Sequence, residues 1–540
     1  MRLPSSLGAI AFVVIAATPV WADDDGVGKI KVGVPNAVTP IPGVAQPTLV
    51  DPDFAVRLLA TAEDKLENPS GIITKFGILA SGVRTEPDQN TFVVFPHSPG
   101  GPTADFNYGH RFLYQGHENA GNLAYITRIN LDVNDPAHRI TLLTPVNGSG
   151  LTGFNAIDGS TFNPFTNTLL FTQETSSAGN GTGAVIQVTT GWPPVVNTLE
   201  AFFGLGGYEG IHPDDKGTIY LQEDIGGATA PAGTLATIDG TPNVPLRGAR
   251  QPNSFVYRYV PNNPRRLEDG GKLQALQVSI DGSPVVFHAG DVVGDITADA
   301  QRKLHTPGTS WPIKWVTVHE SHAGDTASFS ATAAAKAAGA TPFKRPENMA
   351  WLPGADFNTF FFSPTGDTDA PTGQIPQLAA RGAWGALFRV DLADRPGDDD
   401  DHDHGKGHKD DGRISIFVLG DQEHNSFDNV AFANERQLLA AEDRGNALHQ
   451  QLQTFDSVWA YDVKTGKVLR FIALGRDAAA IAQGEDNEPT GVFVSNGSTR
   501  KEALLGTEES LDDARGFFTQ QHGDNNVYEF FNVKKKFAHQ

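Results

Sequence analysis

The stretch Phe165-Thr-Asn-Thr-Leu-Leu-Phe-Thr-Gln-Glu174 joins a polar turn to a short β-rich run that ends on an acid. The same order recurs in Asp215-Lys-Gly-Thr-Ile-Tyr-Leu-Gln-Glu-Asp224 and Asn434-Glu-Arg-Gln-Leu-Leu-Ala-Ala-Glu-Asp443, with a weaker copy at Asp356–Asp367. Repeats of about 40–50 residues that contain only strands are typical of the blades of a β-propeller. The sequence therefore predicts an all-β fold, a β-propeller of about six blades.

Other segments fit the same pattern, because they are short β-rich runs bounded by Gly, Asn, Asp or Pro. They are Thr91–Phe95, Arg111–Tyr114, Ile140–Leu143, Thr218–Leu221, Asn358–Ser363 and Ser457–Asp462. A few helical insertions are expected, at the Ala-rich Ser328–Ala340 and at Arg476–Gln483. The segment His319-Glu-Ser-His322 is expected in a loop, since its spacing does not match the HExxH motif of zinc enzymes.

The charge balance favours partners that are cations. The chain has 540 residues, 63 acidic against 41 basic side chains, a formal net charge of -22 and no cysteine. Such an acidic surface argues against nucleic acid as a partner, because phosphate backbones attract Lys and Arg. The absence of cysteine excludes disulfides and thiolate metal sites.

The N-terminus has the pattern of a secretory signal. Arg2 precedes the apolar Leu7–Ala17, and Ala22 is a small residue that suits cleavage, so residues 1–22 are expected to be a signal peptide. Residues 23–53 then read as an extended lead-in and 54–540 as a single propeller domain, in which 397–412 form an acidic disordered loop. No membrane span is expected, and the mature protein is predicted to be exported, periplasmic or extracellular.

The acids at the ends of the repeats have a physical consequence. In a propeller, equivalent strand ends converge on the central channel, where carboxylates repel one another by several kcal/mol unless cations bind between them. Candidate metal ligands are the acids Glu118, Glu174, Glu209, Asp443 and Glu488. Each of the pairs Glu223-Asp224 and Glu442-Asp443 is expected to place one acid at the channel. Asp428 and Asn429 add oxygen donors that suit Ca²⁺.

The stretch Gly339-Ala-Thr-Pro-Phe-Lys-Arg-Pro-Glu-Asn-Met-Ala-Trp351 combines a cation, a proline and a carboxylate at Arg345, Pro346 and Glu347. A residue before proline avoids the helical region, so Arg345 is expected in an extended conformation at a loop or strand start. This arrangement suits a phosphate clamp, Arg345, beside a metal ligand, Glu347.

Several motifs together resemble the PhoX-type alkaline phosphatases, secreted bacterial enzymes with a β-propeller fold. Gly339–Glu347 is similar to that family's GATP-x-x-RPE signature. The shorter matches follow in the family's order: Thr172-Gln-Glu174, Tyr208-Glu209, Asp428-Asn429 with Glu442-Asp443, Glu488-Pro-Thr-Gly491 and Gln521-His-Gly523. The resemblance implies a metallophosphatase that uses Ca²⁺ and a pair of Fe³⁺ ions on phosphomonoesters. It implies metal ligation by Glu174, Glu209 and Glu347, with Glu118, Asp443 and Glu488 as further ligands, and phosphoryl binding by Arg345.

The chain departs from this family at Gln173, where the resemblance places an iron-bridging cysteine. A neutral amide cannot replace a thiolate between two ferric ions, so Ca²⁺ is the expected cofactor and Fe³⁺ is not favoured. The expected partners are a small phosphorylated substrate or metal ions. Two alternatives stay open: a non-catalytic Ca²⁺-binding propeller that acts as a binding or surface protein, and another propeller hydrolase of the phytase or lactonase type.

Overall fold

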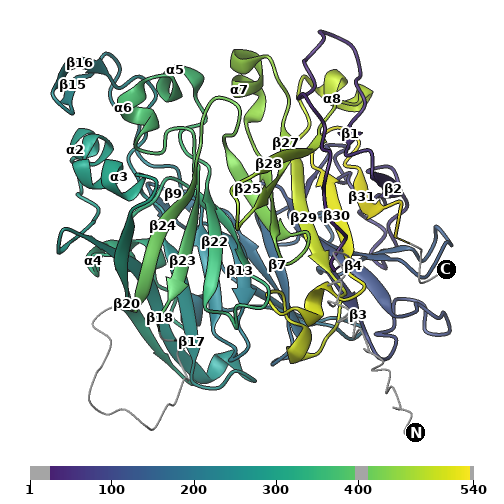
Figure 1. Cartoon of the computed structure of the whole chain (residues 1–540). Helices are drawn as coiled ribbons and strands as arrows, with labels where there is room; N and C mark the ends of the chain where they lie inside the picture. The colour runs from purple at the N-terminus through teal and green to yellow at the C-terminus, as the bar shows by residue number, and fades with distance from the viewer. Residues whose placement is uncertain (1–24, 394, 396–410, 536–540) are drawn as a thin grey trace, which may run out of the picture.

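The computed structural model describes residues 25–393, 395 and 411–535. Within these residues the main strands form the blades of a six-bladed β-propeller, so the predicted all-β class is confirmed (Figure 1). One strand of each blade lies innermost, and it contacts the innermost strands of the two neighbouring blades. These six inner strands, which surround the central channel, are β3, β7, β13, β21, β25 and β29.

The first three blades follow the chain in order. Blade 1 contains β3 (Glu86–Val94), β4 (Arg111–Glu118), β5 (Tyr125–Asn130) and β6 (Ile140–Leu142). Blade 2 contains β7 (Ile157–Asn163), β8 (Thr168–Gln173), β11 (Ile186–Thr189) and β12 (Val196–Thr198), with the small hairpin β9 (Ser176–Ser177) and β10 (Asn180–Gly181) beside it. Blade 3 contains β13 (Tyr208–Pro213), β14 (Ile219–Glu223), β17 (Val256–Pro261), β18 (Gly270–Ile280) and β20 (Ser310–His322), with β19 (Ser283–Pro284) paired to β18.

The last three blades complete the ring. Blade 4 contains β21 (Pro346–Trp351), β22 (Thr359–Pro364), β23 (Ala386–Leu392) and β24 (Gly412–Leu419). Blade 5 contains β25 (Phe427–Phe432), β26 (Gln437–Glu442), β27 (Ser457–Asp462) and β28 (Val468–Ala473), with β1 (Leu49–Val50) at its edge. Blade 6 contains β29 (Pro489–Ser495), β30 (Arg515–Gln520), β31 (Val527–Asn532) and β2 (Phe54–Ala60).

Two strand pairings differ from those of a ring of separate blades, each built from one continuous segment. The strand β20 pairs with β24 from Ser310↔Ser415 to Ile313↔Gly412, and this joins blades 3 and 4 into one continuous sheet. The strand β2 precedes all the blades in sequence, but it pairs with β31 and completes the last blade. The ring is therefore closed by main-chain hydrogen bonds between the beginning and the end of the described chain.

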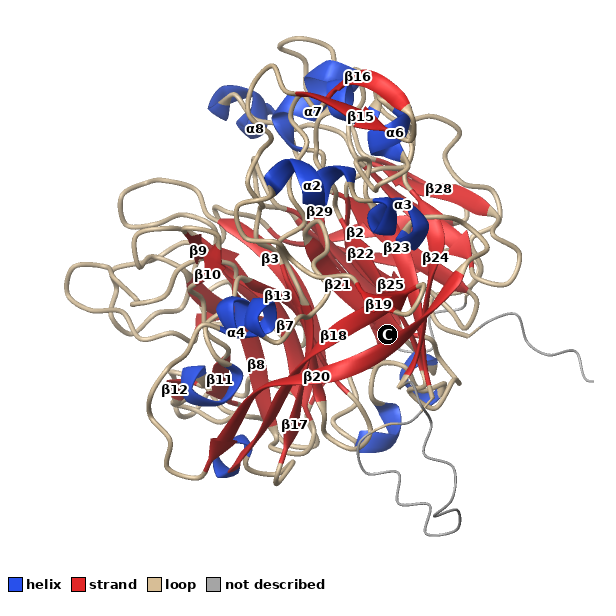
Figure 2. Cartoon of the chain, turned by 90° about the vertical axis from the view of Figure 1, so that its left-hand side faces the viewer, coloured by secondary structure: helices blue, strands red, loops and turns tan. Residues whose placement is uncertain are grey.

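The helices interrupt the strands, as predicted. The predicted helical segments contain α4 (Ala331–Ala337) and α8 (Ala478–Gln483). The sequence did not indicate the others, which are α1 (Glu200–Phe203), α2 (Val292–Thr297), α3 (Asp299–Leu304), α5 (Ala370–Gly373), α6 (Pro376–Ala379) and α7 (Gly445–Leu452). The helices α5, α6, α7 and α8 gather with the hairpin β15 (Leu235–Ile238) and β16 (Thr241–Pro245) at one end of the propeller (Figures 1 and 2).

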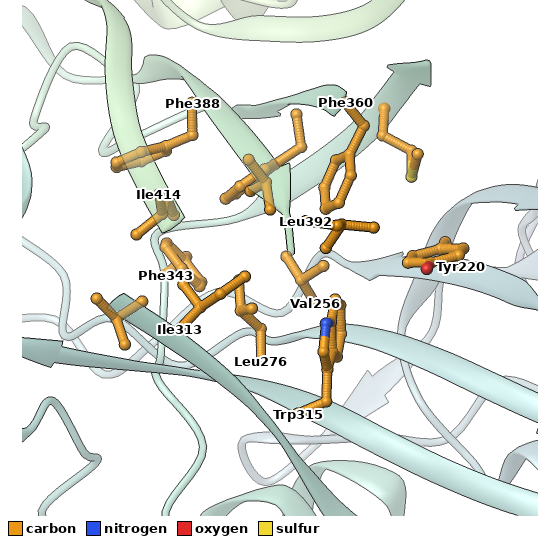
Figure 3. Packing of buried hydrophobic residues seen from close by; sticks show 14 of the residues in the cluster. Tyr220, Val256, Leu276, Ile313, Trp315, Phe343, Phe360, Phe388, Leu392 and Ile414 are labelled. Carbon is orange, nitrogen blue, oxygen red and sulfur yellow. The ribbon is translucent and has the colours of Figure 1, made fainter. Parts of the chain in front are cut away.

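The largest buried hydrophobic cluster lies between blades 3 and 4 (Figure 3). Within it, the ring of Tyr220 meets those of Trp351 and Trp315 edge to face at centroid distances of 4.8 and 5.8 Å. Such aromatic pairs contribute about 0.5–1.5 kcal/mol each beyond the burial of their surface. This packing fixes the orientation of β14 and β21, the strands that carry acids to the channel.

Several expectations concern particular segments. The sequence predicted a loop at His319 and His322, and this prediction is wrong. Both residues lie in strand β20, because its pairing with the long strand β18 continues through them. Residues 1–22 of the predicted signal peptide lie outside the described residues, as does most of the predicted loop 397–412. Among the described residues, no helix has the length and apolar character needed to cross a membrane.

Candidate metal centre and active site

The predicted repeat corresponds to one position in four blades. Its copies are the second strands β8, β14, β22 and β26, counted outward from the channel. The strands β22 and β26 are followed in the chain by α5 and α7, which lie at the same end of the molecule (Figure 1). These two strands therefore end on the same side of the propeller.

The inner strands carry a feature that the sequence did not indicate. In β13, Tyr208 pairs with Glu223 and Ile211 pairs with Leu221, so three steps on one strand face two on the other. This is a β-bulge, and the same shift occurs at the same place in all six inner strands that the structure describes. A bulge leaves a residue out of the ladder and re-aims its side chain.

The first residue inside each bulge is a carboxylate in five blades and glycine in the sixth. In blade order these residues are Asp88, Asp158, Glu209, Glu347, Asp428 and Gly491. All five carboxylate residues are buried. We call these five the bulge carboxylates.

The residue after the bulge carboxylate contacts a neighbouring inner strand in at least two blades. It is Gly159 in blade 2, where an added Cβ would lie 1.7 Å from the carbonyl oxygen of Glu209 in blade 3. In blade 4 it is Asn348, whose Oδ1 lies 2.9 Å from Nε2 of His212 in blade 3. The bulges therefore also hold neighbouring inner strands together.

Six of the acids form two groups of three, and within each group the carboxylate oxygens lie within 4.8 Å of one another. One group is Asp88, Glu118 and Asp158, and the other is Glu209, Glu347 and Asp428. Of the predicted ligands, Glu209 and Glu347 are thus brought together directly, and Glu118 joins two residues that sequence reasoning missed.

The other predicted ligands surround these groups. Glu174 follows β8, and burial first, and then the charges of Asp224, Glu118 and Glu347, raise the pKa of its carboxyl. Burial also raises the pKa of Glu488, and the charges of Asp443, Asp428 and Asp88 add to this effect. These strand-end acids are half-buried, whereas the bulge carboxylates are buried, so the site has an accessible layer above a deep one.

Burial, followed by mutual repulsion, raises the pKa of these acids. The pKa of Glu347 is raised to about 8 and that of Asp88 to about 7. The pKa values of Glu118, Asp158, Glu174, Glu209, Asp428 and Glu488 are raised well above the ordinary range, again first by burial. Clustered carboxylates in a dry channel either take up protons or bind cations.

Arg345 is the cation at this cluster. Its Nε lies 3.0 Å from both carboxylate oxygens of Asp224, and its Nη2 lies 2.9 Å from Asp224 Oδ2 and 3.5 Å from Glu347 Oε1. The predicted extended conformation of Arg345 is wrong, since its φ is +57°. The ion pair of Lys344 with the buried Asp367, at 2.6 Å, and the hydrogen bond from Thr365 N to Arg345 O hold the chain in this turn.

The donors fit a hard divalent cation. They are carboxylate oxygens, the ligands that Ca²⁺ and Mg²⁺ prefer, and Asp158 Oδ1 is buried without a hydrogen-bond partner among the described residues. They do not fit a thiolate-bridged iron pair. The Gln173 side chain donates from Nε2 to Asn155 O at 2.8 Å and accepts at Oε1 from Ala184 N at 3.4 Å, so its amide is used by the fold.

A buried network of ion pairs lies next to Asp443 in the chain. Arg444 Nη2 pairs with Glu442 Oε1 at 2.7 Å, and His449 Nε2 lies 2.9 Å from Asp456 Oδ2. Burial lowers the pKa of His449, but Asp456 and Asp486 outweigh it and raise that pKa to about 9. Glu442, the first acid of the pair Glu442-Asp443, is therefore held by this buried network.

The sequence analysis missed Asp88 and Asp158 as site residues, and it noted Asp428 and the pair Glu223-Asp224 without including them among the ligands. A signal for the bulge carboxylates was present, because five of the six inner strands contain, near their start, an acid followed by a glycine or an amide. The pairs are Asp88-Gln89, Asp158-Gly159, Glu209-Gly210, Glu347-Asn348 and Asp428-Asn429.

The fold and the site define a six-bladed propeller with a carboxylate-lined channel and a paired arginine. A family model described as Alkaline phosphatase PhoX matches residues 237–523, which is more than half of the chain. The chain therefore belongs to the alkaline phosphatase PhoX family, and the predicted family is confirmed. No curated protein sequence matches the chain.

Solved structures support the fold. The structure of Pseudomonas fluorescens PhoX in complex with vanadate, a transition state analogue, is 13% identical and has a TM-score of 0.52, with 93% of this chain and 97% of that chain covered. A putative 6-phosphogluconolactonase from Bacteroides uniformis is 11% identical with a TM-score of 0.25, covering 68% of this chain and 84% of its own. At this level of similarity, the second structure carries no argument about function.

Proposed function

We propose that the protein is an exported metal-dependent phosphomonoesterase whose active site is the acidic mouth of the channel. The observation that carries this proposal is the pair of carboxylate groups, Asp88/Glu118/Asp158 and Glu209/Glu347/Asp428, beside Arg345. Cations held by these carboxylates supply positive charge that polarises a phosphoryl group and activates an oxygen nucleophile.

Arg345 would bind the phosphoryl oxygens. Asp224 engages its Nε and Nη2, and this fixes the plane of the guanidinium group with Nη1 directed away from the carboxylate. A guanidinium group fixed by one carboxylate can still donate from Nη1 to a phosphoryl oxygen. Glu347 would serve as a metal ligand, and the hydroxyl of Thr365, which donates to its Oε1, keeps the carboxylate in place.

The experiment is a metal analysis of the isolated protein, followed by p-nitrophenyl phosphate hydrolysis with Ca²⁺, Mg²⁺, Mn²⁺ or Fe³⁺. We expect turnover with a divalent cation and a loss of at least about 100-fold in kcat/KM for Glu347→Gln and for Arg345→Ala. Glu347→Gln should also reduce the rise in Tm that the cation produces, whereas Arg345→Ala should keep it. The exposed Glu320→Gln on β20 is the control.

The alternative functions give different results. Bound cations and a metal-dependent Tm without turnover in any metal would favour the non-catalytic Ca²⁺-binding propeller. Cleavage of a lactone or of inositol hexakisphosphate without cleavage of p-nitrophenyl phosphate would favour the other propeller hydrolases.

Export is supported by the sequence of residues 1–22. Cleavage after Ala22 would leave Asp23 as the mature N-terminus. N-terminal sequencing of the protein from a periplasmic or culture fraction tests this, and a cell-associated chain that retains residues 1–22 would contradict it.

A further inference from the structure

A cavity of about 570 Å³ opens beside the metal centre, between blades 1 and 2. Glu118 and Glu174, two of the candidate ligands, form part of its wall. A phosphoryl group bound at the centre would therefore direct its substituent, the leaving group of the reaction, into this cavity. The cavity is the region that selects among phosphomonoesters.

Two amide side chains of the wall are used by the fold, and the hydroxyl groups of Thr175, Ser176 and Thr182 can both donate and accept. Asn155 Oδ1 accepts from Asn122 N at 2.7 Å, and its Nδ2 donates to Asn122 Oδ1 at 3.0 Å, so its amide is used by the fold. The Gln173 amide is likewise occupied by Asn155 O. In contrast, Asn119 Oδ1 is buried and makes no hydrogen bond among the described residues.

The charge of the wall is negative. Glu86 lies at the rim with 46% of its side chain exposed, and its Oε1 lies 3.9 Å from Nε2 of His522. The described residues that line the cavity include no lysine, arginine, histidine or aromatic side chain. A negatively charged substituent would be repelled here, and a flat aromatic ring would have no partner for stacking.

We propose that this cavity selects phosphomonoesters whose leaving group donates hydrogen bonds and carries no negative charge, and that Glu86 is a specificity-determining residue. The inference rests on the proposed phosphomonoesterase function. Donors on the leaving group would interact with the exposed carboxylate of Glu86 at the rim. The donors are either hydroxyl groups of a polyol or sugar, or an ammonium group.

The test compares a substrate whose leaving group is uncharged with one whose leaving group carries a carboxylate. We expect kcat/KM for glycerol 2-phosphate to exceed that for 3-phosphoglycerate by at least about tenfold at low salt, and the ratio to fall in 0.5 M NaCl. Glu86→Lys should lower this ratio by about tenfold. Glu320→Lys, the same change of charge at an exposed position on β20, should leave the ratio unchanged.

O-phosphoethanolamine distinguishes the two kinds of donor. If its kcat/KM exceeds that of glycerol 2-phosphate and Glu86→Gln removes the excess, the site recognises an ammonium group. If the two substrates are equal in both proteins, it recognises hydroxyl groups.

The two ways to fail are separate. If p-nitrophenyl phosphate is not cleaved in any metal, the proposed function is wrong and this inference falls with it. If it is cleaved but 3-phosphoglycerate and glycerol 2-phosphate react equally, or Glu86→Lys leaves their ratio unchanged, only the specificity inference is wrong.

Discussion

At the scale of single residues, the bulge carboxylates oppose folding unless their charge is neutralised. Asp158 shows this most clearly, since burial first, and then Asp88, Glu118 and Glu174, raise the pKa of its carboxyl. Its Oδ1 is a buried acceptor without a donor among the described residues. The residue is therefore unfavourable for the metal-free fold, and a bound cation would make it favourable.

Asp158→Asn should consequently have opposite effects with and without metal. In EDTA we expect the variant to be more stable than the unchanged protein by about 1–3 kcal/mol, because repulsion and burial of charge are removed. With a saturating cation we expect the variant to be the less stable of the two. Thermal melts of both proteins in EDTA and in Ca²⁺ measure this, and a loss of stability in EDTA would contradict it.

Arg345 shows what local rules leave out. The preference of a residue before proline predicted an extended backbone, but the side chain is held by Asp224 from blade 3 and the main chain by the turn between Lys344 and Asp367. A positive φ costs a non-glycine residue on the order of 1 kcal/mol, and these tertiary contacts offset it. The chemical identity of the clamp was readable from the sequence, and its conformation was not.

At the scale of elements, the inner strands depend on close contact at their bulges. Gly159 follows the bulge carboxylate of β7, and a Cβ there would overlap the carbonyl oxygen of Glu209 on β13. Gly159→Ala should therefore displace one inner strand from the other and move Asp158 and Glu209 apart.

We expect Gly159→Ala to lower the free energy of unfolding by at least about 2–3 kcal/mol and to weaken cation binding at least tenfold. Denaturant unfolding and calorimetric Ca²⁺ titration measure the two effects. Gly148→Ala is the matched control, because no atom lies within 4 Å of the added Cβ. Equal behaviour of the two variants would show that the bulge is not tightly packed.

Among the elements, the sequence pattern predicted the second strands of four blades but not the bulges of the inner strands. The repeated pattern of a turn, a strand and an acid correctly located β8, β14, β22 and β26. A blade's second strand follows a turn after the inner strand and runs antiparallel to it, so the pattern marks the same position in each blade. The bulges were not predicted, since a register shift is a property of two paired strands and leaves no period in either. Asp88 and Asp158 were missed for this reason.

At the scale of the whole molecule, the ring closes where β2 meets β31. Glu529 on β31 is buried there, and it receives a hydrogen bond from Arg515 Nε at 2.8 Å and one from Arg57 on β2. Burial raises the pKa of Glu529, but the two arginines outweigh it and hold the pKa below its usual value.

A lowered pKa in the folded state means that the ionised Glu529 stabilises the fold above the unfolded pKa, about 4.3, and that this stability is lost as the pH falls through the folded value. Glu529→Gln should then cost about 1–3 kcal/mol at pH 7, and the difference should shrink towards zero below about pH 4. Urea unfolding at both pH values measures it, and a difference that does not change with pH would contradict the ion-pair account.

The continuous sheet of blades 3 and 4 gives the ring unequal joints. A ladder of four residue pairs crosses between blades at β20 and β24, whereas the described main-chain pairs between other blades, such as Val94 with Ser498 and Gly183 with Gly206, are isolated bridges. Under thermal fluctuation or mechanical load, blades 3 and 4 would separate from their neighbours as one rigid unit, with amide protons along the shared ladder exchanging last. This unit would contain Arg345, Glu347, Glu209 and Asp224, so opening of the ring would widen the channel and leave these four residues together.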